Sequence, residues 1–166
     1  MRLPRWAPWV REVLQGSPAI TGVKPFAEAG IQDKPVGHII TLRTGATVAV
    51  QWVRTSADGN DDHSLPEEPV TGEPPTAVTL PELPSSGRTS LALVEEHLAA
   101  LITNGGSSEI RAVERKSVRP EPGPRPYSVI VHMHSGAKVV GLFLRSAPAG
   151  ASIGQGGGEY QNRDEV

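Results

Sequence analysis

Hydrophobic and polar residues alternate in two stretches of the chain that have the same outline. Residues 38–57 and 129–148 each contain a run of alternating residues, a reversal with glycine and a second run. Alternation on both sides of a tight turn is typical of a β-hairpin. When Gly45 is aligned with Gly136, the two stretches share four residues: Ile39/Ile130, Ala46/Ala137, Val48/Val139 and Arg54/Arg145. We interpret the two hairpins as diverged copies of one motif.

A helix and a strand are expected before each hairpin. Residues 4–15 have apolar residues at helical spacing and are followed by Gly16, which predicts a short helix. Thr89 or Ser90 is a suitable cap for a second helix, whose apolar stripe is Leu91, Val94, Leu98, Leu101 and Ile102. On this helix we expect Glu95, Glu96 and His97 to form the solvated side. Short strands are predicted at residues 20–23 and 110–118.

This order predicts an α+β fold built from two diverged αβββ repeats. The halves, residues 1–57 and 88–148, would form one antiparallel sheet with the helices packed on one face. Residues 58–87 are acidic and proline-rich and contain no Lys or Arg, so we predict a linker in which residues 76–80 could add an edge strand. The polar, glycine-rich residues 149–166 are predicted to be disordered.

Composition narrows the class of protein. The net charge of −2 argues against a protein whose whole surface wraps nucleic acid, because that requires a basic field. There is no cysteine, which excludes disulfide scaffolds and thiolate metal sites. The first residues lack the apolar run of an export signal and no stretch has the length of a membrane span. We therefore expect a cytoplasmic protein that does not enter the membrane.

The second hairpin suggests how the protein acts. Its return strand, residues 139–144, is apolar at every position, which is typical of a strand covered on both faces. We predict a protein interface at Val140, Leu142, Leu144, Gln51 and Val53, with a partner protein or a second copy of the chain, in a homodimer, as its occupant. The function expected is that of a non-catalytic scaffold or adaptor, for example an accessory protein of a mobile element or virion.

Nucleic-acid binding is the alternative hypothesis. Five basic residues could gather at the Arg-rich strand and the hairpin tips to contact phosphates: Arg43, Arg111, Arg115, Lys116 and Lys138. Exposed aromatic residues that could stack on bases are scarce beside these charges. Because the net charge is negative and exposed aromatic residues are scarce, we favour protein binding over nucleic-acid binding.

No motif for catalysis or for a cofactor is evident. The sequence contains no nucleophile elbow, phosphate-binding loop or HExxH motif, so we predict neither an enzyme nor a cofactor. His132 and His134, two residues apart on one predicted strand, are weak candidates for metal ligands. A third ligand is not evident, and we predict no metal site.

Overall fold

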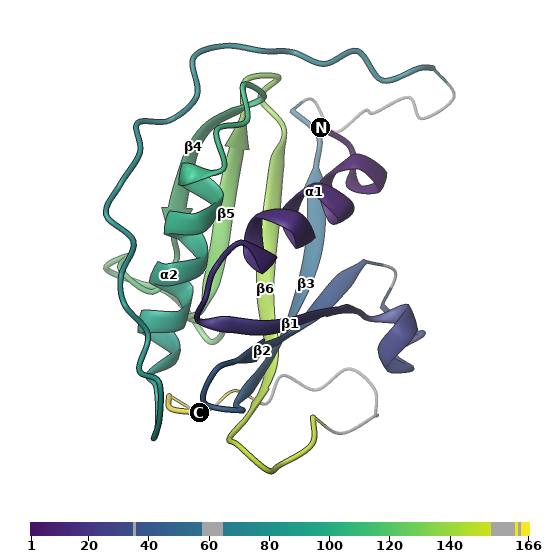
Figure 1. The fold of residues 1–166 in the computed structure, drawn as a ribbon. Helices are drawn as coiled ribbons and strands as arrows, with labels where there is room; N and C mark the ends of the chain where they lie inside the picture. Colours follow the sequence, from purple (N-terminus) through teal and green to yellow (C-terminus); the bar gives the residue numbers. More distant parts are fainter. Residues whose placement is uncertain (35, 58–64, 154–161, 163) are drawn as a thin grey trace.

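The described part of the chain forms two α-helices, one 3-10 turn and six strands, and Figure 1 shows their arrangement. The computed structural model describes residues 1–34, 36–57, 65–153, 162 and 164–166. The elements in chain order are α1 (Leu3–Gln15), β1 (Ile20–Pro25), the 3-10 turn η1 (Ala27–Ala29), β2 (Gly37–Leu42), β3 (Thr47–Thr55), α2 (Leu91–Asn104), β4 (Ile110–Arg115), β5 (Ser128–Met133) and β6 (Lys138–Ala147). Neither described helix is long and apolar enough to span a bilayer.

The six strands form one antiparallel sheet in the order β1-β2-β3-β6-β5-β4. Both helices pack on the same face of this sheet, α1 across its centre and α2 along β4 and β5 (Figure 1). The predicted α+β class, the antiparallel sheet and the placement of the helices are confirmed. From either edge toward the centre the strands follow in chain order: β1, β2 and β3 from one edge, and β4, β5 and β6 from the other.

The two halves also match in local geometry. Gly45 and Gly136 occupy the two hairpin turns with φ of 87° and 81°, a conformation that glycine adopts without steric cost. Both β1 and β4 shift register just after their first residues, Ile20 and Ile110. Descent of the halves from one duplicated motif stays a prediction, because similar geometry does not establish common origin.

The core lies between the helices and the sheet. Trp6 of α1 packs edge-on against Trp52 of β3, with ring centroids 5.4 Å apart. The Trp52 indole also covers Gly141 of β6, where an added Cβ would lie 2.3 Å from the ring atom Cζ3. Glycine therefore stands in the apolar strand β6 because the indole occupies the space of a side chain.

Helix α2 begins as the sequence predicts. The Ser90 hydroxyl accepts a hydrogen bond from the Leu93 N–H at 3.2 Å, which satisfies one of the free amide groups of the first turn. Four members of the predicted apolar stripe are fully covered, namely Leu91, Val94, Leu98 and Ile102, and Leu101 is partly buried.

The linker takes a course that the sequence did not predict. Residues 65–84 have no regular secondary structure. They begin beside the N-terminus, where Glu67 and Leu65 bind Arg2, cross the end of the sheet and then run along the outer side of α2 (Figure 1). The side-chain amide of Asn104 donates to the Val78 carbonyl and accepts from the Val78 N–H, each at 2.8 Å. No strand forms at residues 76–80, because their backbone is engaged by this helix end instead of by a sheet edge. Residues 58–64 lie outside the described residues.

The end of the chain differs from the disorder expected of residues 149–166. The Thr89 and Val166 backbones exchange two hydrogen bonds, at 2.7 and 2.9 Å. The Val166 side chain is buried in the core, and the Leu91 N–H donates to the Asp164 carbonyl at 2.8 Å. Residues 164–166 are thus ordered by the residues that precede α2. Residues 154–161 and 163 lie outside the described residues.

Candidate functional site

The sheet face opposite the helices is the main candidate surface, and we call it the open face. Trp52 and Val50 point into the core, so their neighbours in β3 point to the other side. Residues paired directly across antiparallel strands share a face, and the register pairs Gln51 with Leu142 and Val53 with Val140. By the same register the apolar members of the open face are Ile39, Ala49, Val53, Ala112, Ile130, Val140 and Leu142.

Four of the five predicted interface residues meet at the centre of this face. Val53 is 37% exposed, and Gln51, Val140 and Leu142 are partly exposed beside it. Leu144 is the extra residue at a β-bulge, where the register shifts between Ala49 and Val50. The bulge sets Leu144 apart from the strict alternation of its strand.

Charged side chains lie at one margin of the open face. Glu114 of β4 is opposite Ile130, and its carboxylate accepts from Arg119 at 2.6 Å and contacts His132 Nε2 at 3.1 Å. The Arg119 hydrogen bond, followed by the His132 contact, lowers the pKa of Glu114 to about 2. An apolar centre with a charged margin resembles the core and rim of a protein interface.

The two candidate metal ligands do not act together. His132 lies on β5 and contacts Glu114, whereas His134 follows the strand and its Nε2 lies 2.9 Å from the carbonyl of Glu73 in the linker. An added Cβ at Gly72 would lie 2.4 Å from the His134 ring, so that ring packs on the linker backbone. Among the described residues no group of three metal-ligating side chains occurs.

The five basic residues of the nucleic-acid hypothesis do not form one patch. Thr47 pairs with Ala147 and Thr55 pairs with Lys138, so the two hairpin turns lie at opposite ends of the β3–β6 pair. Eight residue steps along β3 separate Arg43 from Lys138 by about 27 Å or more. Arg43 and Lys138 therefore do not lie together at one end of the sheet, as the nucleic-acid hypothesis requires.

The Arg-rich strand is also divided between different surroundings. Arg115 lies on the helix face, bonded to the Ala92 carbonyl and paired with Glu95 and Glu96 of α2. Arg111 is exposed at the other end of β4, and the Lys116 N–H is bonded to β5. Arg115 therefore serves the fold. Arg111 and Lys138 lie at one end of the sheet, on either side of β5, and Arg43 lies at the other end.

Glu95 is buried, whereas the sequence pattern predicted that it lies on the solvated side of α2. Its side chain is fully covered, and its carboxylate accepts from the backbone N–H of Ser117 at 3.2 Å and of Ser128 at 2.7 Å, and from the Ser117 hydroxyl. A buried carboxylate is tolerated when such donors surround it. Glu95 thus joins α2 to the strands β4 and β5.

His97 is the second buried group on that supposedly solvated side. Its Nδ1 lies 2.6 Å from the Pro81 carbonyl and its Nε2 lies 2.8 Å from the Ser17 hydroxyl. Because a carbonyl only accepts, Nδ1 carries the proton and Nε2 accepts from Ser17. Burial lowers the pKa of His97, which favours this neutral form. These two hydrogen bonds of His97 connect Pro81 of the linker to Ser17 in the loop after α1.

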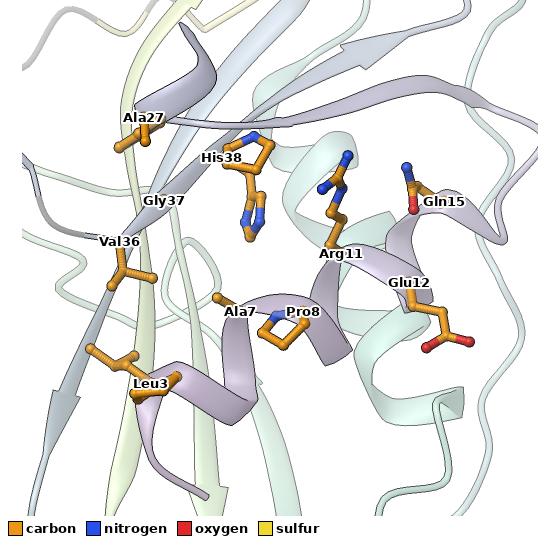
Figure 2. Close-up of a pocket in the computed structure, with 13 residues that line it drawn as sticks. Leu3, Ala7, Pro8, Arg11, Glu12, Gln15, Ala27, Val36, Gly37 and His38 are labelled. Atoms are coloured by element: carbon orange, nitrogen blue, oxygen red, sulfur yellow. The ribbon is translucent and has the colours of Figure 1, made fainter. Parts of the chain in front are cut away.

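A pocket of about 580 Å³ lies between α1 and the adjoining ends of β1 and β2 (Figure 2). Its walls are mostly apolar, and His38 is its most deeply buried polar side chain, 2% exposed. The Trp52 Nε1–H donates to His38 Nδ1 at 2.9 Å. Burial first, and then the charge of Arg11, lower the pKa of His38 to about 4. No sequence pattern indicates this pocket, because its walls come from separate segments.

Comparisons with family models, with curated proteins and with solved structures found no match to this chain.

Proposed function

We propose that the protein is a non-catalytic scaffold that associates with a second copy of itself through the open face. The observation that carries this proposal is the cluster of Val53, Val140 and Leu142 on the two central strands, partly exposed on the side without helices. Burial of apolar side chains between two such faces would provide the driving force.

The size of the face is consistent with a dimer. Six strands spaced by about 4.8 Å, with outer strands about 20 Å long, give roughly 600 Å² per copy. Two copies would bury about 1,200 Å², the lower limit of a specific, stable interface. We therefore expect a reversible dimer of modest affinity.

A second copy of the chain suits the centre of the open face. In a face-to-face dimer the two-fold axis lies in the plane between the two sheets, and residues near that axis meet their own counterparts in the other copy. Val53, Val140 and Leu142 lie at the centre of the face, so they would pack against apolar side chains of the second copy.

The test is the mass in solution, measured by light scattering over protein concentrations from about 1 to 300 μM. We expect twice the chain mass at the upper end and dissociation on dilution. Leu142→Arg should give a monomer, because it places a charge at the centre of the interface. Val118→Arg is the matched control, since Val118 is 65% exposed and follows β4 in a loop; this variant should dimerise normally.

Circular dichroism establishes that each variant is folded. Val53→Arg provides a second substitution at a more exposed site of the same face and should also give a monomer. A wild-type chain that is monomeric at every concentration would overturn the proposal. So would folded arginine variants that dimerise as the wild type does.

A further inference from the structure

The pocket beside α1 has the features of a site for a small molecule. Its volume of about 580 Å³ is within the usual range of ligand pockets, roughly 300–1,000 Å³. Leu3, Ala7 and Pro8 line it from the helix and Val36 lines it from the segment before β2 (Figure 2). These walls suit an apolar group.

His38 offers a hydrogen-bond donor to this pocket. An indole N–H can only donate, so the Nδ1 that receives the Trp52 hydrogen bond carries no proton. The proton of the neutral imidazole is therefore on Nε2, and no described residue accepts it. The ring extends from β2 toward α1, between Pro8 and Arg11 (Figure 2). An N–H that lines a pocket and has no partner among the described residues can donate to an acceptor on a ligand.

Arg11 provides a positive charge next to this donor. Its guanidinium lies near His38 (Figure 2), close enough to contribute to the lowered pKa of that ring. The ion pair of Arg11 with Glu28 is long, at 3.9 Å, and exposed, so it leaves the guanidinium able to bind a ligand. The Glu12 carboxylate points away from His38 (Figure 2). Gln15 also lines the pocket and can donate or accept. The two donors nearest the His38 ring are thus its own Nε2–H and the cationic Arg11.

We propose that this pocket binds a small amphipathic carboxylate, with its apolar chain on the walls from α1 and Val36 and its carboxylate on His38 Nε2–H and Arg11. A carboxylate accepts from both donors at once. The pocket lies on the helix side of the sheet, so this inference is independent of association through the open face.

Titration calorimetry with octanoate tests the proposal, and 1-octanol is the neutral probe of the same chain length. We expect saturable binding of one octanoate per chain and about tenfold weaker binding of octanol. Arg11→Gln should weaken octanoate binding about tenfold and leave octanol binding unchanged. Arg88→Gln is the control, because it removes one positive charge at a distant, 80% exposed side chain.

Two further variants separate the pocket from other sites. Ala7→Phe, which fills the pocket from α1, should abolish octanoate binding while the circular dichroism spectrum is retained. Leu142→Arg, on the open face, should bind octanoate as the wild type does. The proposal is overturned if octanoate shows no saturable binding up to about 10 mM, if octanol binds equally well, or if folded Ala7→Phe or Arg11→Gln binds octanoate normally.

Discussion

The burial of His38 should make the stability of the protein depend on pH. His38 is 2% exposed, and its Nδ1 accepts the indole proton only when the ring is neutral. Burial and Arg11 lower the pKa of the folded ring from 6.5 to about 4. Protonation is therefore favoured in the unfolded chain, where the ring has its ordinary pKa.

The sign and size of the effect follow from linkage. Above pH 6.5 the ring is neutral in both states and proton binding does not affect the free energy of unfolding. As the pH falls from 6.5 toward 4, the unfolded state binds the proton first. The free energy of unfolding then decreases by about 1.4 kcal/mol per pH unit, in total by about 3 kcal/mol. Stability is thus present above pH 6.5 and lost as the pH approaches 4.

His38→Gln isolates this contribution. A glutamine can accept the indole hydrogen bond through its side-chain oxygen but does not titrate, while every other ionisable group is retained. We would measure urea unfolding by circular dichroism at intervals from pH 7.5 to 4.5. The difference in unfolding free energy between wild type and variant should change by about 2–3 kcal/mol in favour of the variant over this range.

A difference that stays constant with pH would refute the reasoning, because it would mean that His38 titrates alike in both states. The buried His97 also has a lowered pKa, but it is present in both proteins and cancels in the comparison.

Three further predictions concern stability measured by urea unfolding. Gly141→Ala should cost about 1–3 kcal/mol, since its Cβ would lie 2.3 Å from Trp52 Cζ3; an unchanged midpoint would show that the indole can move away. Gly45→Ala and Gly136→Ala should each cost about 1–2 kcal/mol, because both glycines have positive φ, and a loss at only one turn would contradict their equivalence. Glu95→Ala should cost about 3 kcal/mol by leaving two backbone N–H groups without their acceptor, whereas a loss below 1 kcal/mol would show that water replaces the carboxylate.

Sequence patterns predict only part of the candidate sites. Alternation along a strand places Gln51 and Val53 on one face of their strand, and Val140 and Leu142 on one face of theirs. It could not reveal that β3 and β6 pair with each other, which brings these residues into one cluster. The sequence does not indicate the pocket around His38 either, because its walls come from three separate segments.

Local spacing determined both helices, both hairpin turns and the α+β class, because helix and strand periodicity depend on neighbours two to four residues apart. Only the tertiary structure decided that the hairpin turns lie at opposite ends of the sheet, that Glu95 and His97 are buried, and that Val166 enters the core. Those outcomes depend on contacts between distant residues, such as the 33 positions that separate Glu95 from Ser128. A periodic sequence pattern does not predict such a contact, because Glu95 and Ser128 meet only in the folded chain.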